Sequence, residues 1–367
     1  TMKSIQILFT VAFIGLSSVV IKAQQIPLSS LYNENRFMIN PANAGDGDFL
    51  EAYLGTRSQW DGISGSPQTH YLSVHSPVGK GSNIGINVYF DRTQLINTLS
   101  SNLAYAYDIK LAQDHNLSFG LAIGLFNTSL DLSNAIVEDP TDELLAQGDV
   151  SAFTIDGDFG LRYNWKGLEF GASAAHLFET GPQFEKIGAN HQLDLKRQYN
   201  GYLGYEIWLK DHTWLIHPSA MYRFLPDAPV QFDANLKLGY KNIVWLGGSY
   251  RAETGPVASL GVEISDKFSI AYAYDFALNG IDNSIFSHEV MVGFQLGGFM
   301  KRIENLENDM DQVKQDNELL NSRADSIENM IKGFEEDIER IDGTDRNQQE
   351  QLDSINLEID RLYKELE

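Results

Sequence analysis

The chain has 367 residues, no cysteine and a formal net charge of −23 from 27 basic and 50 acidic side chains. Because there is no cysteine, no disulfide framework holds the fold together, and stability must come from a hydrophobic core, a closed sheet or association. The acidic balance argues against proteins that bind nucleic acid or anionic lipid through a basic patch.

The first residues have the pattern of an export signal. One basic residue, Lys3, is followed by an apolar run and then by small residues that end at Ala23. A secretory signal peptide has this order of basic, apolar and small-residue regions. The alternative, a membrane-spanning helix, needs about 20 apolar residues, and Ser17 and Ser18 interrupt the run. We predict a signal peptide over residues 1–23 and a mature protein outside the cytoplasm.

Residues 24–48 are polar and precede the first strand pattern. They include the stretch NPANAG at residues 40–45. Pro41 fixes its own φ and favours an extended Asn40, while Gly45 permits a sharp reversal of the chain. The segment is too polar for lipid and too long for a simple lead-in, so we expect a plug that folds in or beneath the mouth of the following domain. A plain turn is the alternative.

Apolar and polar residues alternate through most of residues 49–298. In Leu99–Leu111, the odd positions are mostly apolar and the even positions are mostly polar or small. This period of two is typical of a strand with one apolar and one polar face. It predicts fourteen strands, at residues 50–60, 68–77, 83–91, 99–111, 116–127, 153–165, 167–178, 196–207, 213–223, 230–240, 242–252, 256–265, 268–276 and 288–297.

Strand length and loop pattern distinguish a membrane barrel from a soluble sandwich. Strands of roughly 9 to 13 residues match a tilted membrane crossing, whereas soluble strands cluster at about 5 or 6. Short connections alternate with long ones, as at the two rims of an outer-membrane barrel, and an even strand count leaves both termini on the periplasmic side. We therefore predict an all-β transmembrane barrel of about 14 antiparallel strands, with its apolar side chains toward lipid.

Individual residues agree with this orientation. A sandwich would have to hide charged residues such as Asp156, Arg162 and Asp233, whereas a polar lumen holds them as paired charges. Aromatic residues near strand ends fit an interfacial girdle, and we assign five to it: Trp165, Trp208, Trp214, Tyr240 and Trp245.

Residues 299–367 have a different composition and a heptad repeat. They contain 20 acidic and 9 basic side chains and no proline. Apolar residues keep the a and d positions in phase from residue 303 onward, which predicts an α-helical coiled coil. Its core residues, with a polar exception at Asn317, are Ile303, Leu306, Met310, Val313, Asn317, Leu320, Ile327, Ile331, Phe334, Ile338, Ile341, Leu352, Ile355, Ile359 and Leu362.

The form of this coiled coil stays open in two respects. The phase is kept across Gly343 and Asp345, which favours one continuous helix of ~95 Å over a hairpin. Asn317 at an a position favours a parallel dimer, while isoleucine at several d positions favours three or more strands. We expect a periplasmic stalk that self-associates or binds other periplasmic helices. An oligomerisation segment without another partner is the alternative.

Catalytic and metal-binding patterns are weak in this sequence, and we expect neither an enzyme nor a cofactor. Catalysis needs a base with an orienting carboxylate, or a nucleophile and a base, that converge at one rim. Two DGD stretches, at 46–48 and 156–158, lack the later ligands of a calcium loop. The candidate residues are His70, His75, His176, His217, His288 and Glu289.

Several short motifs occur together in a recognisable order. NPANAG is followed by RSQWDGISGSPQT from Arg57, then by YAYD at 105–108, and by HEVMVGF from His288. In this order they resemble the PorP/SprF family of outer-membrane proteins of the Bacteroidota type IX secretion system, over about residues 25–298. The residues that carry the N-terminal part of the resemblance are Asn40, Pro41, Ala42, Gly45, Arg57 and Trp60.

The resemblance implies a 14-stranded outer-membrane barrel that assists type IX cargo. Such cargo includes large cell-surface adhesins with type B C-terminal domains, among them those of gliding motility, which the barrel helps to export or anchor. We expect the cargo to meet the long-loop rim or lumen mouth, at 61–67, 128–151, 179–195 and 277–287. A porin or a FadL-like transporter of hydrophobic solutes is the alternative, because NPA also occurs near the N-terminus of that family.

Overall fold

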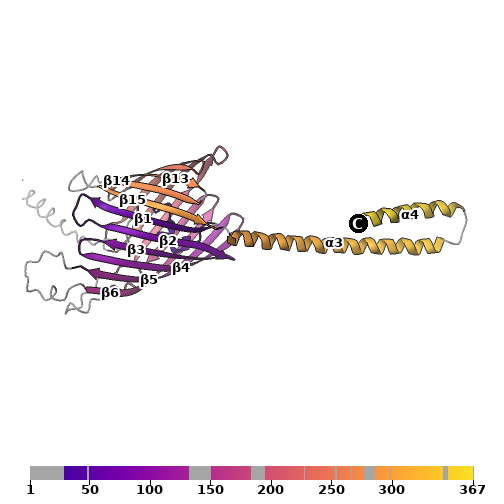
Figure 1. The fold of residues 1–367 in the computed structure, drawn as a ribbon, viewed down its shortest axis with the longest axis horizontal. Coiled ribbons are helices and arrows are strands. Elements are labelled where there is room, and N and C mark those ends of the chain that lie inside the picture. Colours follow the sequence, from indigo (N-terminus) through magenta and orange to yellow (C-terminus); the bar gives the residue numbers. More distant parts are fainter. Residues whose placement is uncertain are drawn as a thin grey trace, which may run out of the picture. The chain divides into compact units, whose positions relative to one another are not determined.

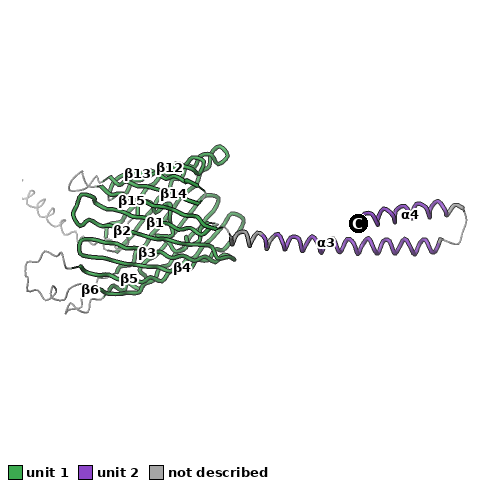
Figure 2. The backbone as a smooth tube through the Cα atoms, in the orientation of Figure 1, with its two compact units in different colours: residues 1–300 green, residues 301–367 purple. Residues whose placement is uncertain are grey.

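The chain forms two compact units, residues 1–300 and 301–367 (Figure 2). The predicted signal peptide and most of the three long segments 128–151, 179–195 and 277–287 lie outside the described residues. The computed structural model describes residues 29–47, 49–131, 150–182, 195–226, 228–252, 254–265, 267–276, 286–297, 299–341 and 346–366.

The first unit is a closed antiparallel barrel (Figure 1). β8 and β9 both pair with β10 and form one strand interrupted at Glu206, so the wall has the fourteen strands predicted. β1 pairs with β15 and β10 pairs with β11, which closes the wall. The strands are β1 (Leu50–Asp61), β2 (Gln68–Gly79), β3 (Ser82–Arg92), β4 (Ile96–Ala112), β5 (His115–Leu130), β6 (Val150–Trp165), β7 (Leu168–Ala175), β8 (Gln198–Tyr205), β9 (Ile207–Leu209), β10 (Trp214–Phe224), β11 (Gln231–Tyr240), β12 (Val244–Arg251), β13 (Gly255–Ser265), β14 (Phe268–Phe276) and β15 (Phe286–Leu296).

Apolar side chains point out of the barrel wall and polar side chains point into the lumen. Leu103, Leu121 and Phe153 are 60%, 60% and 76% exposed, whereas Asp156 and Arg162 are 1% and 4% exposed. An apolar outer face around a polar interior is the arrangement of an outer-membrane barrel. The predicted orientation of the strands is confirmed.

One residue assigned to the aromatic girdle, Trp245, lies inside the barrel instead. Its side chain is 8% exposed, and the Nζ atom of Lys237 lies 4.6 Å from its ring centre. The neighbours on β12, Val244 and Leu246, are 37% and 62% exposed, so the alternation places Trp245 on the inner face. The girdle assignment was wrong for this residue because position along a strand does not determine which face a side chain occupies.

The two rims of the barrel carry different connections. At one rim, hairpins turn through residues with a left-handed backbone, such as Asp114 (φ 63°), Lys166 (φ 47°) and Asn242 (φ 53°). Positive φ at turn residues gives the twist that a tight hairpin needs. The other rim, which we call the long-loop rim, carries the connections β5–β6, β7–β8 and β14–β15, at residues 131–149, 176–197 and 277–285.

The second unit consists of two helices, α3 (Phe299–Ile341) and α4 (Arg346–Leu366). The prediction of one continuous helix is therefore wrong; the intervening residues 342–345 lie outside the described residues. α4 runs back beside the C-terminal part of α3, where Ile331 is only 5% exposed (Figure 1). A hairpin buries the same heptad seam as a continuous rod, so the heptad phase does not distinguish them. In the described part of the chain, no helix has the length and apolarity that a membrane crossing needs.

Candidate functional site

The N-terminal segment lies inside the barrel lumen. We call residues 29–47 the plug. Leu31, Tyr32 and Phe37 are 2%, 1% and 3% exposed, which requires that the barrel wall surround them. The plug has little regular structure beyond two short 3₁₀ helices, η1 (Arg36–Met38) and η2 (Pro41–Asn43). Side chains rather than sheet hydrogen bonds therefore hold it in place.

A buried group of charges on β1, β14 and β15 binds the start of the plug. Glu289 accepts hydrogen bonds from Ser29 Oγ and from the Ser30 backbone N–H, both at 2.7 Å. Asp275 accepts one from Ser30 Oγ at 2.8 Å. Arg57 bridges both carboxylates, with its Nη2 atom 2.6 Å from Asp275 Oδ2 and its Nη1 atom 3.4 Å from Glu289 Oε2. Buried charges are tolerated only when paired in this way.

Two other parts of the wall bind the middle of the plug. On β11, Lys237 Nζ lies 2.7 Å from Glu34 Oε2, and Asn235 Nδ2 donates to the Tyr32 hydroxyl at 2.7 Å. Burial is the main cause that raises the pKa of Tyr32, so the phenol stays neutral. On β7, a further ion pair joins Glu169 to Arg36 of η1. The plug is thus attached to opposite sides of the cylinder.

The NPANAG stretch forms a compact turn against β5 and β6. Asn40 caps η2: its Oδ1 atom accepts from the Ala42 N–H at 2.9 Å, and its Nδ2 atom donates to the Leu161 carbonyl at 2.9 Å. Gly120 on β5 faces the backbone of Pro41 and Ala42 so closely that a Cβ atom would overlap both. Glycine in the wall therefore allows the turn to approach.

The end of the plug is fixed by Gly45 and Asp46. Gly45 has a φ of 66°, and its N–H donates to His75 Nδ1 at 3.2 Å. Asp46 forms an ion pair with Arg162 of β6. Burial alone would raise the pKa of Asp46, but the guanidinium groups of Arg162 and Arg36 outweigh burial and lower it. Asp46 is therefore ionised at neutral pH.

A cavity of about 510 Å³ lies between the plug and the long-loop rim. Residues 37–41 of the plug form its floor. Its walls come from the strand ends at that rim, including Ile96, Phe126, Thr128 and Gln198. The size falls within the range of ligand sites, about 300–1,000 Å³.

The lining of the cavity combines apolar and polar side chains. Among the described residues, the buried Oδ1 atoms of Asn87 and Asn102 and the Nε2 atom of His176 have no hydrogen-bond partner. All three residues line the cavity, beside the rings of Phe37 and Phe126. These three atoms are themselves buried from solvent, so they do not open into the cavity, whose lining also includes polar residues such as Ser100 and Thr128. The cavity can therefore receive polar and apolar groups together, as an extended peptide presents them.

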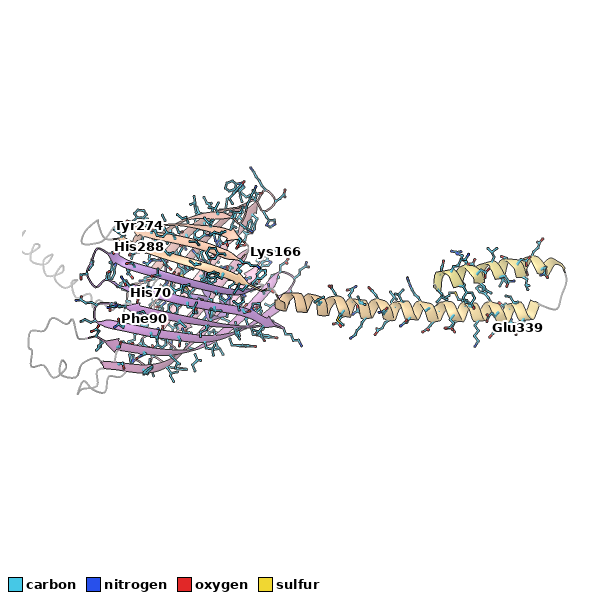
Figure 3. The ribbon with its side chains drawn as sticks, viewed as in Figure 1. His70, Phe90, Lys166, Tyr274, His288 and Glu339 are labelled. Atoms are coloured by element: carbon cyan, nitrogen blue, oxygen red, sulfur yellow. The ribbon has the colours of Figure 1, made fainter. Side chains whose placement is uncertain are left out.

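The residues considered for catalysis are separated by the wall. His70 and His288 lie on the outer face, where His70 stacks on Phe90 with ring centres 6.5 Å apart (Figure 3). His75, His176 and His217 lie inside but apart, next to Gly45, Asp156 and Tyr202 respectively. Glu289, considered as a catalytic carboxylate, holds the plug instead. Asp48 of the first DGD stretch lies outside the described residues.

The structure brings most of the motif residues together, with one exception. Asn40, Pro41, Ala42 and Gly45 belong to the plug, and Arg57 binds its start. Trp60 does not join them, because it lies 46% exposed at the end of β1. The partners on the wall, such as Asp275 and Lys237, were not singled out from the sequence as plug contacts. In the sequence, the signal that could have identified them is their position on the inward-facing side of the alternating pattern.

Comparison with known proteins identifies the family. A family model described as "Type IX secretion system membrane protein PorP/SprF" matches residues 21–294. The chain belongs to the PorP/SprF family. Family and fold are therefore those of a secretion-system barrel in the outer membrane, not those of an enzyme. No curated protein matches this PorP/SprF chain.

Solved structures that match this chain include a transporter, a FadL homologue and a porin. The Pseudomonas putida toluene transporter TodX matches with a TM-score of 0.43 and 12% identity, over 73% of this chain and 93% of that chain. A FadL homologue of Pseudomonas aeruginosa matches with a TM-score of 0.43 and 11% identity, over 69% and 91%. The KdgM porin matches with a TM-score of 0.35 and 10% identity, over 67% and 99%.

Proposed function

We propose that this PorP/SprF barrel helps to export a large cell-surface adhesin of the gliding type and holds it at the outer membrane. An extended segment of the cargo would lie in the cavity above the plug. The observation that supports this most is the cavity itself: it faces the long-loop rim, it has a fixed floor, and its lining mixes apolar residues with polar ones such as Asn87.

The plug also weighs against the alternative of a porin. A diffusion pore needs an open lumen, whereas the plug is bound to three parts of the wall through Glu289, Lys237 and Glu169. Planar-bilayer recordings separate the two functions. We expect no large, stable conductance steps from the purified full chain. Such steps would support the porin and contradict the anchor.

Filling the cavity tests the cargo site directly. Thr128 lines the cavity and is 6% exposed, while Leu125 on the same strand points outward and is 55% exposed. Thr128→Trp should therefore release the adhesin from isolated outer membranes, and Leu125→Trp, the matched control, should retain it. Equal adhesin content with both variants would show that the cavity does not hold cargo. Competition by a toluene-like solute would instead point to transport of hydrophobic molecules.

The helical unit would link the barrel to other copies or to periplasmic components. Its apolar heptad residues support this, since Leu306 and Val313 are 61% and 58% exposed on α3. Deleting residues 303–367 should leave a barrel that still shifts on gels when heated, but should abolish association or motility. If the number of chains in the assembly stays the same after the deletion, the proposed link is contradicted.

A further inference from the structure

The heptad seam of α3 is covered along only part of its length. Beside α4, Ile331 is 5% exposed. Nearer the start of the helix, Leu306, Val313 and Leu320 are 61%, 58% and 60% exposed. α3 has 43 residues and α4 has 21, so α4 is too short to reach this part. We call residues 306–320 the open seam.

Three residues of the open seam favour two parallel strands. Leu306 and Leu320 occupy two of its three d positions, with Val313 at the third, and Asn317 occupies an a position. Leucine at d favours a dimer, and a single asparagine at a fixes the register of parallel chains. The d-position isoleucines that favour larger assemblies lie outside the open seam: Ile327 and Ile355 are partly buried where α3 and α4 run side by side.

The charges beside the open seam complement a second copy of the same helix. Asp309 is at a g position and Lys314 is at the following e position. In a parallel pair in register, each g residue faces the e residue of the next heptad on the other chain. Asp309 would therefore face Lys314 of the second copy, twice per dimer. Within the described residues, neither has an ion-pair partner in its own chain.

Membrane insertion supplies the parallel orientation. α3 follows β15 after residues 297 and 298, so each copy is tied to its barrel by the same end of the helix. Barrels insert into the outer membrane in one orientation, because their turns and long loops lie on opposite sides. Two neighbouring copies therefore present the open seam in the same direction. Confinement to one membrane also raises their effective concentration.

We propose that residues 306–320 of two copies of this chain form a parallel two-stranded coiled coil that joins two barrels. The dimer ends where α4 covers the seam, so each chain keeps its own α3–α4 hairpin. This pairing rests on the link proposed above for the helical unit, but it does not depend on cargo binding in the cavity, so a failure of the cargo site leaves it intact.

A charge-reversal experiment on the full chain tests the pairing. Two differently tagged copies are expressed together, purified in detergent and measured by co-purification and native mass. Lys314→Glu alone places Asp309 against Glu and should weaken the dimer about tenfold. Asp309→Lys alone should do the same. When a copy with Lys314→Glu meets a copy with Asp309→Lys, both attractive pairs are restored. This mixed pair should therefore associate as the unchanged chain does.

Matched controls keep the outcome interpretable. Asp311→Lys and Lys332→Glu make the same charge changes at b positions of α3, away from the seam, and should not alter the dimer. Every variant is checked for the gel shift of a folded barrel on heating. A monomeric unchanged chain, a mass of three copies, or a mixed pair no stronger than Lys314→Glu alone would overturn the proposal.

Cysteine cross-linking gives an independent readout in intact membranes. The chain has no native cysteine, so a single introduced thiol reports one position. Val313→Cys, at a d position, should form a disulfide dimer on mild oxidation. Gln315→Cys, at the outer f position, should not. Equal cross-linking at both positions would indicate random collision and refute the register.

Discussion

Replacing Gly120 by alanine should loosen the plug without unfolding the barrel. The added Cβ would overlap the backbone of Pro41 and Ala42, and a backbone cannot rotate away as a side chain can. The η2 turn must therefore shift, which stretches the 2.9 Å hydrogen bond from Asn40 Nδ2 to the Leu161 carbonyl. Overpacking costs about 1–3 kcal/mol and a lost hydrogen bond about 1 kcal/mol. We expect a total loss of about 2–4 kcal/mol.

Hydrogen exchange measures this loss. A change of about 3 kcal/mol lowers the ratio of docked to released plug by roughly 100-fold, so amides in residues 29–47 should exchange faster by that order. Gly248→Ala is the matched control, because no atom lies within 4 Å of a Cβ built at this position on β12. Both variants should keep their heat-modifiable gel shift. Equal exchange of the plug in the two variants would refute the close fit at Gly120.

Three further predictions test other contacts. Arg57→Met leaves the carboxylates of Asp275 and Glu289 buried without their shared cation, which costs about 3–5 kcal/mol and should raise exchange at residues 29–31. Leu236→Arg puts a charge on a lipid-facing side chain that is 46% exposed, and should destabilise folding into vesicles by ~2–4 kcal/mol, while Val244→Arg at the rim should cost ~0–1 kcal/mol. Because the folded pKa of Asp46 is lowered, its contact with Arg162 contributes stability above the unfolded pKa of about 3.9 and loses it as pH falls through the folded value. Pepsin should therefore cut the plug faster as pH falls in that range, and Asp46→Asn should make this dependence shallower.

The barrel could be predicted because its cause is local. Lipid outside and water inside impose opposite chemistry on successive residues of every strand, so the alternation in Leu99–Leu111 already contains the orientation of the wall. The same alternation also places Trp245 on the inner face of the wall, which its aromatic side chain and its position near a strand end do not reveal. The break between α3 and α4 could not be predicted in this way, because a continuous helix and a hairpin bury the same heptad residues.

The plug contacts could not be predicted because they join residues far apart in sequence. Lys237 and Glu34 are separated by 203 positions, and Ser29 and Glu289 by 260. No periodic pattern connects such pairs, and many inward-facing charges on the wall offer equivalent partners. The sequence therefore predicted a polar segment at the barrel mouth, but not which side chains hold it.

The attachment of the plug to several strands has a consequence for the proposed anchoring of a surface adhesin. A force on a molecule seated over Phe37 and Ile39 would pass into the plug before it reached the wall. Glu289, Glu169 and Lys237 lie on different strands, so the force would be shared among separate parts of the cylinder. Releasing any one of these contacts leaves a charge unpaired inside the lumen, which adds to the cost of moving the plug. A plug held in this way resists pulling better than a loop attached at one point.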